Sequence, residues 1–497
     1  MGAIKIMGRH KKTVMTDEGV DRRENGYYST PHFVTEFITT ELLNLNESGR
    51  TVFDPCIGKE EMASAFKRAG KAVTGWDIED FGVHEVAEFE QRDFLSFYGE
   101  KKDCCILGQK PELSYDYYVA NPPYNCHESN YIRANKKRLQ HLFPQIGVAN
   151  MYSMFLSAMI DIAKPGAVLG IITNDSFLTS RMHEELRKHI LSVCRITHLL
   201  LCPVDLFWKQ RADVRTCIII LVKEQVKTDY ELKVLNRPEN IEKFKKTLSL
   251  NMFAREIVSD LVLRSEQDRH EFVIGCPKSI RKLFNLPRLS QKFRCVTGIS
   301  TGNDKKYLRK NKDSYYSIPF YKNPGMRRFW MEPDGYLPSD FLEIDTKVSN
   351  FMVRNKDLLY KEGISCSSMG IPFGACALPS GSTYGVNANI FCEHEDRYWL
   401  LSYLNSSLVT YLVKGILLRT NMITSGYVSR IPLVSISTQG KAKLEAIAEK
   451  AVEQKIQKAE YIDLIKKIDE IIFTESGIPE SEINLVRDFC ENIMKRT

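Results

Sequence analysis

Short β-rich runs alternate with helical patterns through the first 225 or so of the 497 residues, and this order constrains the fold more than any other feature. The β-rich runs lie at residues 51–56, 72–78, 115–122, 167–174, 196–203 and 215–224. Helical patterns lie at 59–70, 150–166 and 182–194. This alternation predicts an α/β domain with a mainly parallel sheet covered by helices on both faces. The last two runs have no clear helix between them, so we expect that pair to be antiparallel.

The rest of the chain changes character twice. A charged stretch with a helical pattern covers about 226–285, and a stretch richer in Gly, Ser, Asn and aromatic residues follows it to about 435. We therefore expect a Rossmann-like domain over 1–240, a helical connector over 241–287, a mixed α+β domain over 288–435 and a C-terminal helical segment over 436–497. Within that last segment, residues 440–473 read as one helix.

The composition excludes several classes of protein. Hydrophobic residues make up 43% and charged residues 26%, which is typical of a soluble globular protein. No apolar run approaches the ~18 residues that cross a membrane, and the start of the chain is too charged for a signal peptide. We expect a cytoplasmic protein with no membrane contact. Thirteen cysteines without a C-x-x-C pair favour neither disulfides nor zinc, so we expect no metal.

Acidic residues follow three strands of the predicted sheet where each strand ends. Asp54 begins a turn that contains Gly58, Asp77 ends the next strand, and Asp93 precedes Phe94. Polar residues at these ends are common in any doubly wound fold, but they are also where nucleotide-like ligands bind. Neither G-x-G-x-x-G nor a P-loop motif is present in this region. The pattern favours a ligand with ribose and adenine but no phosphates, and S-adenosylmethionine fits that description.

The run Asn121-Pro122-Pro123-Tyr124 follows the strand at 115–120 and supplies a rigid pair of acceptors beside an aromatic ring. The Asn121 side-chain oxygen and the Pro122 carbonyl can accept hydrogen bonds from a planar NH₂ group and make its nitrogen nucleophilic. The two prolines restrict the backbone, and Tyr124 can stack on a flat substrate. Prolines also mark ordinary turns, so the motif gains its meaning from the acidic strand ends before it.

These motifs occur in an order that resembles the gamma-class DNA adenine-N6 methyltransferases of restriction–modification systems, which have a C-terminal target recognition domain. The family's Y-x-T-P matches residues 28–31, and DPCIG, WDI, RDF and NPPY follow. The resemblance implies Asn121, Pro122 and Tyr124 as catalytic residues, and Tyr124 with Phe207 as contacts of a flipped-out adenine. It implies that S-adenosylmethionine contacts Tyr28, Thr30, Asp54, Cys56, Gly58, Asp77, Ile78, Asp93 and Phe94.

One position departs from the family pattern. The family has DPxxGxGxF after the first strand, and here Glu60 occupies the place of the second glycine. A carboxylate at that place could bind the ammonium group of the methionine moiety, or it could narrow the pocket. The departure bears on cofactor affinity rather than on cofactor identity.

The substrate is not determined by NPPY, because enzymes that methylate protein glutamine or RNA adenine share this motif. The segment 288–330 favours DNA, because it holds eleven Lys and Arg against two Asp, a net +9, with aromatic residues interleaved. A solvated basic face would look the same. The candidate DNA-binding residues are Arg133, Lys136, Lys137, Lys305, Lys306, Arg327 and Arg328.

We therefore expect a site-specific, adenine-specific DNA methyltransferase that acts on double-stranded DNA as a monomer. The alternatives are an RNA adenine or protein glutamine methyltransferase, and a DNA-binding relative with weak catalysis. About 26 residues precede the Y-x-T-P element, too few for a fused nuclease domain. A separate restriction endonuclease stays open as a partner, as does docking of a partner on the C-terminal helix.

Overall fold

A computed structural model describes residues 27–104, 112–124, 129–210, 214–226, 228–266, 268–369, 372–418, 422–456 and 458–494. Asn125, next to the NPPY run, lies outside the described residues. The chain divides into two compact units. Unit 1 covers residues up to Val262 together with His270–Ile274, and unit 2 covers Leu263–Arg269 together with the chain from Gly275 onward.

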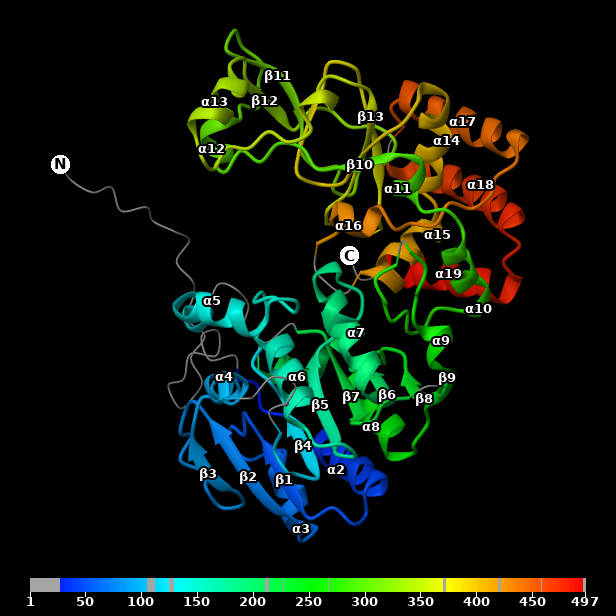
Figure 1. Ribbon diagram of the computed structural model, residues 1–497. Helices are drawn as coiled ribbons and strands as arrows, with labels where there is room; N and C mark the ends of the chain where they lie inside the picture. Colours follow the sequence, from blue (N-terminus) through cyan, green and yellow to red (C-terminus); the bar gives the residue numbers. More distant parts are fainter. Residues whose placement is uncertain are drawn as a thin grey trace, which may run out of the picture. The chain divides into compact units, whose positions relative to one another are not determined.

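Unit 1 is built on a nine-stranded sheet in the order β3-β2-β1-β4-β5-β7-β6-β8-β9, and Figure 1 shows its first strands in blue. The strands are β1 Thr51–Asp54, β2 Ala72–Asp77, β3 Glu88–Gln91, β4 Tyr117–Ala120, β5 Val168–Asn174, β6 Arg195–Leu201, β7 Thr216–Val222, β8 Glu231–Leu235 and β9 Ala254–Ile257. The pairs from β3 through β5 are parallel, and β7 runs antiparallel between β5 and β6. The predicted Rossmann-like sheet and the predicted antiparallel pair are both confirmed.

Alternating side chains of the central strands feed two separate cores, one on each face of the sheet. Phe53, Tyr118 and Ile171 join one core, while Val52 and Tyr117 join the other. The first core is covered by α4 Phe94–Cys104, α5 Asn130–Leu142, α6 Met151–Ile162, α7 Glu184–Val193 and α9 Val258–Leu261. The second is covered by α2 His32–Leu45, α3 Ala63–Arg68 and α8 Ile241–Ser249. Burial on both faces explains why the strands read as continuous apolar runs.

The region 241–287 was predicted to be a helical connector; helices α8, α9 and α10 Lys278–Lys282 do lie there, but so does strand β9. Strand β8 pairs with β6, and β9 pairs with β8, so this region extends the sheet of unit 1. Residues up to Val262 belong to unit 1, and the boundary therefore lies later than residue 240. Strand β8 alternates charged and apolar residues over its first four positions, whereas β9 has two adjacent charged residues and is mostly exposed. Neither run is long enough to distinguish a strand from one side of a helix.

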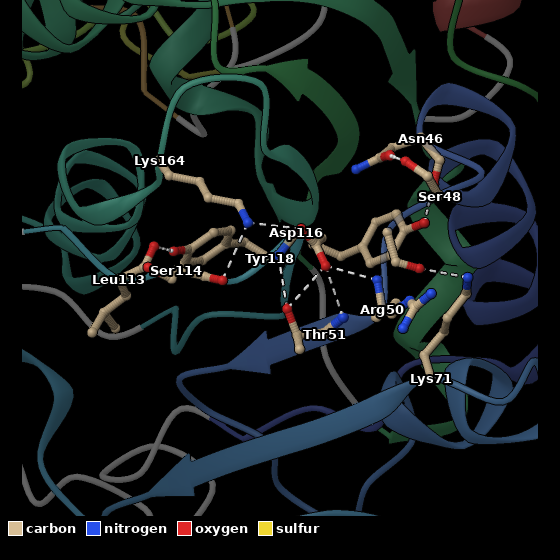
Figure 2. Close-up of polar contacts among 12 residues, drawn as sticks. Asn46, Ser48, Arg50, Thr51, Lys71, Leu113, Ser114, Asp116, Tyr118 and Lys164 are labelled. Atoms are coloured by element: carbon tan, nitrogen blue, oxygen red, sulfur yellow. Dashed lines mark hydrogen bonds and ion pairs between the residues drawn. The ribbon is translucent and has the colours of Figure 1, made fainter.

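A polar network around Asp116 links the amino-terminal ends of β1 and β4, and Figure 2 shows this network. Its carboxylate accepts hydrogen bonds from the backbone N–H groups of Arg50 (2.7 Å) and Thr51 (3.0 Å) and from Lys164 Nζ (2.7 Å). Burial raises the pKa of Asp116, but the hydrogen bonds from Lys164 and the backbone lower it by a larger amount. The pKa of Asp116 therefore lies below its ordinary value. The network fixes the register of β1 against β4.

Unit 2 has the mixed α+β character that the sequence predicted for 288–435. A four-stranded antiparallel sheet contains β10 Arg294–Val296, β13 Gly363–Cys366, β14 Ala375–Leu378 and β16 Asn389–Phe391. A three-stranded sheet contains β11 Tyr316–Tyr321, β12 Gly335–Pro338 and β15 Thr383–Tyr384. The short helices among these strands are α10 Lys278–Lys282, α11 Leu289–Lys292, α12 Asp304–Tyr307, α13 Phe341–Lys347 and α16 Ser425–Val428.

Longer helices complete unit 2, and the single helix predicted at 440–473 is two helices. They are α14 His394–Leu404, α15 Ser407–Thr410 with a π-helix at Tyr411–Leu417, α17 Thr438–Glu453, α18 Lys458–Ser476 and α19 Glu480–Met494. Helix α17 packs on α14, and α18 packs on α17. Within the described residues, no single helix is long and apolar enough to cross a membrane, and one bent pair, His394–Leu404 with Ser407–Leu417, passes by length and composition only.

Candidate functional site

A pocket opens at the carboxyl ends of β1, β2 and β4. The strand order reverses between β1 and β4, and such a switch point is where open α/β sheets bind ligands. The pocket is lined by Tyr27, Pro55, Cys56, Asp77, Ile78, Glu79, Phe81, Arg92, Asp93, Phe94, Asn121, Pro123, Tyr131, Met151 and Phe155. It therefore brings three of the predicted acidic and aromatic strand ends together with the NPPY run.

Of the nine predicted cofactor residues, five line the pocket: Cys56, Asp77, Ile78, Asp93 and Phe94. The other four stand behind it. Asp54 is buried and accepts the Cys56 N–H (3.0 Å), and Gly58 donates its N–H to Asp77 Oδ2 (3.0 Å). Tyr28 and Thr30 contact Asn121. The roles of all nine toward a cofactor stay predictions.

Gly58 is required by its neighbour Tyr27. Its φ is +55°, and a Cβ at this position would lie 2.7 Å from the Tyr27 ring. Tyr27 also donates its hydroxyl to Glu61 (2.5 Å) and packs its ring on Phe81 at a centroid distance of 4.8 Å. The glycine thus lets the N-terminal segment close against the turn after β1. The Y-x-T-P motif points to Tyr28, and sequence reasoning missed Tyr27 as a pocket wall.

Two carboxylates of the site, of buried Asp54 and half-buried Asp77, have no cationic partner among the described residues. Burial raises the pKa of Asp54 to about 8 and that of Asp77 to about 6. Neither forms an ion pair with a Lys, Arg or His in the described part of the chain. Because a buried carboxylate is stabilised by positive charge, these two groups favour a cationic ligand beside them.

Asp93 connects the pocket to two helices. Its carboxylate accepts the N–H groups of Leu95 (3.0 Å) and Ser96 (3.1 Å) at the start of α4, which is the role of an N-cap. It also accepts the hydroxyl of Tyr131 on α5 at 2.8 and 2.9 Å. Tyr131 was not predicted as a site residue, because nothing in the sequence near it signals contact with a residue 38 positions earlier.

Asn121 follows β4 directly, and all polar atoms of its side chain have partners. Its Nδ2 donates to the Tyr28 carbonyl (2.6 Å) and to Thr30 Oγ1 (3.0 Å), and its Oδ1 accepts the hydroxyl of Tyr124 (2.6 Å). Burial raises the pKa of the Tyr124 phenol well above its usual value, so this group stays a donor. The bonds to Tyr28 and Thr30 fix the direction in which Oδ1 points.

Three aromatic rings gather beside Asn121. Tyr124 stacks on Tyr28 at a centroid distance of 5.5 Å, and Phe207 lies 6.4 Å from Tyr124 at a steep angle of 71°. Phe207 lies in a 3₁₀ segment, Val204–Gln210, and is fully buried. The predicted base contacts Tyr124 and Phe207 are thus neighbours, and Tyr28 lies with them rather than in the cofactor pocket.

Glu60 takes neither of the two roles considered for it. It is not part of the pocket wall, and its carboxylate accepts the backbone N–H groups of Glu85 (3.0 Å), Val86 (3.0 Å) and Ala87 (2.9 Å). The residue is 2% exposed and has a φ of +61°. This left-handed backbone costs a non-glycine residue roughly 1–2 kcal/mol.

The candidate DNA-binding residues of unit 1 share one exposed face of α5. Arg133, Lys136 and Lys137 are all exposed and form no ion pair with a described residue. The buried residues Ile132 and Leu139 hold the opposite face of the helix in the core. Arg138, which belongs to the same cluster in the sequence, instead donates to Ser96 Oγ (2.8 Å).

The candidates of unit 2 do not behave alike. Lys305 and Lys306 lie exposed on α12. Arg327 forms an ion pair with Asp334 (2.7 Å). Arg328 is 6% exposed and donates to the Asn405 carbonyl (2.6 Å), so its prediction as a DNA contact is wrong. In sequence the two arginines look equivalent, because nothing local tells which of two neighbours in an extended segment points inward.

Residues 101–274 match the family model described as N-6 DNA Methylase. The matched segment contains NPPY and most of the sheet that carries it. This part of the chain is similar to that family, and the expected resemblance to adenine-specific DNA methyltransferases of restriction–modification systems is confirmed.

Among curated proteins, the chain is 26% identical over 201 residues to the type II methyltransferase M.BanIII of Aneurinibacillus aneurinilyticus, covering 34% of each chain. It is 24% identical over 211 residues to the type I restriction enzyme MjaIX methylase subunit of Methanocaldococcus jannaschii, covering 38% of this chain and 36% of the relative. The chain thus spans about a third of the length of the curated relatives it matches.

Among solved structures, the DrdV–DNA complex aligns with 88% of this chain and 58% of its own at a TM-score of 0.55 and 11% identity. A nuclease-deletion mutant of the type ISP restriction-modification enzyme LlaGI, in complex with a DNA substrate mimic, aligns with 86% of this chain and 54% of its own at a TM-score of 0.55 and 13% identity. At these identities the likeness shows a shared fold, and it extends over both units.

Proposed function

We propose that this protein transfers a methyl group from S-adenosylmethionine to the exocyclic N6 of a flipped-out adenine in double-stranded DNA. One observation carries the proposal: Asn121, directly after β4 at the switch point, lines the pocket together with Asp77 and Asp93 and is also hydrogen-bonded to Tyr28 and Tyr124 of the aromatic cluster. A cofactor site and a site for a flat base therefore meet at the Asn121 amide.

The residues of the pocket fit S-adenosylmethionine. Buried Asp54 and half-buried Asp77 have no cationic partner among the described residues, and the cofactor is positively charged at its sulfonium and ammonium groups. Asp77, at the end of β2, has the position from which an acid accepts hydrogen bonds from ribose hydroxyls. Ile78 and Phe94 supply apolar walls for an adenine ring. The bound cofactor supplies an activated methyl group, and the protein prepares the acceptor.

The acceptor nitrogen is prepared by two oxygens. Asn121 Oδ1 and the Pro122 carbonyl accept hydrogen bonds from the two N–H groups of the amine and draw its nitrogen toward a tetrahedral geometry. Tyr124 donates to Asn121 Oδ1 in this structure, and the second lone pair of that oxygen can accept an N–H of the amine. The Tyr124 ring can then stack on the base, a contact worth roughly 1–3 kcal/mol. The proton leaves the nitrogen after the methyl group has been transferred, so no base of shifted pKa is needed.

The DNA would be held by exposed cations of both units. In unit 1 these are Arg133, Lys136 and Lys137, and in unit 2 they are Lys305 and Lys306. We assign target recognition to unit 2, which carries the basic segment predicted for it. The relatives named above belong to restriction–modification systems, and we propose modification of host DNA as the setting of this activity.

The decisive experiment replaces Asn121 by Ala. Duplex DNA of diverse sequence is incubated with labelled S-adenosylmethionine, digested to nucleosides and searched for N6-methyladenine. Loss of a preorganised hydrogen-bonding group is worth about 3–4 kcal/mol, so turnover should fall by roughly 10²–10³-fold while cofactor affinity changes little. Asn44→Ala, an exposed asparagine on α2, is the matched control.

Three outcomes would count against the proposal. A wild-type protein that labels RNA adenine or protein glutamine but no DNA would select the alternative substrates. DNA binding without any methyl transfer would select the catalytically weak relative. Wild-type turnover in Asn121→Ala would contradict the mechanism.

A second experiment tests the DNA face of α5. The triple variant Arg133→Ala/Lys136→Ala/Lys137→Ala should bind DNA with a weaker dependence on salt. The slope of the logarithm of the association constant against the logarithm of the salt concentration should become less negative by roughly 0.9 for each phosphate that the variant no longer neutralises. The control is Arg328→Met, which removes a cation that is already buried and should leave the slope unchanged. An unchanged slope in the triple variant would remove α5 from the DNA interface.

A further inference from the structure

We propose that Glu60 is a positioning residue of the cofactor site, which clamps the loop after β2 and thereby sets one wall of the pocket. This inference rests on the proposed binding of S-adenosylmethionine. It concerns the one residue that departs from the family's glycine pattern, and it gives that departure a physical role.

The backbone at residue 60 keeps the conformation of a glycine. A φ of +61° lies in the left-handed region, where a side chain is disfavoured and glycine is not. A residue in this conformation persists only where its surroundings hold it there. For Glu60 the surroundings are the three donors that bind its carboxylate.

The three donors are consecutive backbone N–H groups. Glu85 and Val86 donate to Oε2, and Ala87 donates to Oε1. Successive backbone N–H groups form a concave site for an anion, and here the anion is supplied by the chain itself. Because both oxygens are engaged and the residue is 2% exposed, the carboxylate is not available to a bound ligand.

The clamped segment forms part of the pocket. Residues 78–87 connect β2 to β3, and Ile78, Glu79 and Phe81 at its start line the pocket. Glu60 holds the end of this loop. Two further bonds hold its beginning to the turn after β1: Ile57 N–H to the Trp76 carbonyl (2.9 Å) and Gly58 N–H to Asp77 Oδ2 (3.0 Å).

The loop after β2 is therefore bonded to the turn after β1 both where the loop begins and where it ends. A loop held in place before the ligand arrives loses less conformational entropy on binding. The clamp touches neither Asn121 nor the aromatic rings beside it. Its loss should raise the KM for S-adenosylmethionine and leave kcat at saturating cofactor unchanged.

The experiment compares Glu60→Gly, which keeps the backbone conformation and removes the carboxylate, with Glu60→Gln, which keeps one acceptor oxygen. Glu88→Gln, an exposed glutamate on β3, is the matched control for loss of charge. The readouts are amide hydrogen exchange at residues 85–87 without cofactor, the cofactor dissociation constant by calorimetry, and steady-state kinetics.

In Glu60→Gly we expect at least tenfold faster exchange at residues 85–87, an increase of at least tenfold in the KM and dissociation constant of S-adenosylmethionine, and a kcat within twofold of wild type. Glu60→Gln should fall between, and Glu88→Gln should match wild type. Unchanged exchange or an unchanged dissociation constant in Glu60→Gly would overturn the proposal. So would a Glu60→Gly protein that fails to fold, because Glu60 would then serve global stability.

Failure of the proposed function gives a different result. If the wild-type protein binds S-adenosylmethionine but methylates no adenine, exchange and calorimetry still test the clamp. If the wild-type protein binds no S-adenosylmethionine, the proposed function fails, and exchange at residues 85–87 still reports whether Glu60 holds the loop.

Discussion

Aspartates lie at both the amino-terminal and the carboxyl-terminal ends of the strands in unit 1, but Asp116 at the amino-terminal ends has a cationic partner that Asp54 and Asp77 at the carboxyl-terminal ends lack among the described residues. We call these two sides of the sheet its amino-terminal edge and its carboxyl edge. At the amino-terminal edge, Asp116 is paired with Lys164 and with backbone donors, and its pKa is lowered. At the carboxyl edge, Asp54 and Asp77 have no cationic partner among the described residues, and burial raises their pKa values to about 8 and about 6. One edge is complete by itself, whereas the other favours a positively charged ligand.

The difference distinguishes Asp116, which aligns strands, from Asp54 and Asp77, which lie at the pocket and favour a cationic ligand. Asp116 receives donors from the start of β1 and from the segment before β5, so it aligns strands. Asp54 and Asp77 accept backbone N–H groups of the turns that surround the pocket, and Asp54 also accepts a hydrogen bond from the Cys56 side chain. Substitutions at the two edges should therefore affect different quantities.

The largest effect is expected for Asp77→Ala. Removal of the carboxylate that we propose as the acceptor for ribose hydroxyls should weaken S-adenosylmethionine binding by roughly 10²-fold, since a hydrogen bond to a charged group is worth about 1.5–3 kcal/mol. Calorimetry measures the dissociation constant. Because Asp77 ionises at a cost in the folded protein, the variant should be at least as stable as wild type without cofactor, and a large loss of stability would erase the contrast between the edges.

Asp116→Asn should show the reverse pattern. The variant loses the ion pair with Lys164 and weakens the bonds from Arg50 and Thr51, so the free energy of unfolding should fall by about 2 kcal/mol. Chemical denaturation measures this quantity, and the affinity of the folded protein for S-adenosylmethionine should stay within twofold of wild type. Equal losses of stability and of affinity would show that the two edges are not independent.

The third prediction concerns pH. A raised pKa keeps Asp54 protonated below about pH 8, and a cation favours its ionised form. Cofactor affinity should therefore rise between pH 6 and 8, by at most about tenfold per unit, and level off above pH 8. Calorimetry at four pH values tests this, and Asp54→Asn should flatten the profile.

The stability of the cofactor-free protein should move in the opposite direction. The unfolded chain ionises Asp54 near the ordinary aspartate pKa, whereas the folded protein does so only near 8, so stability is lost as pH rises through that window. The lowered pKa of Asp116 acts in acid, where its contribution is lost as pH falls below its ordinary pKa. A wild-type affinity that is flat from pH 6 to 8 would contradict the raised pKa of Asp54.

The smallest effect is expected for Lys164→Met. Lys164 is partly exposed, and its pair with Asp116 is screened by solvent, so the free energy of unfolding should fall by only about 0.5–1 kcal/mol. Asp116 keeps its bonds to Arg50 and Thr51. A loss as large as that of Asp116→Asn would mean that the ammonium group, rather than the backbone donors, maintains this edge.

The central sheet could be predicted from the sequence because its strands are buried on both faces and read as apolar runs. Strands β8 and β9 could not, since β8 alternates charged and apolar residues over only four positions and β9 has four residues with two adjacent charges, which does not distinguish a strand from one side of a helix. The break between α17 and α18 was missed because a helical composition continues across it.

The site could be predicted in part. Strand ends with an acid, and the NPPY run, are local signals, and the structure brings Cys56, Asp77 and Asp93 to one pocket. Tyr131 was missed because it reaches the pocket from a distant segment, and Tyr27 was missed because the Y-x-T-P motif points to its neighbour Tyr28.

The net charge of segment 288–330 overstates its free positive charge. Asp268 pairs with Arg288 and Asp357 with Arg294, and both acids lie outside the segment. Charge summed along the chain does not reveal acidic partners that folding brings from other segments. The net charge of segment 288–330 therefore does not identify which of its cations are free to contact DNA.

The clamp at Glu60 also bears on how such a site can change by mutation. Glycine and glutamate codons differ by a single base, so the substitution itself is easily reached. It is tolerable only where three free N–H groups meet the new carboxylate, which excludes proline at positions 85, 86 and 87. Reversion to glycine lifts that restriction, so residue 60 and the loop are an epistatic pair whose allowed sequences depend on each other.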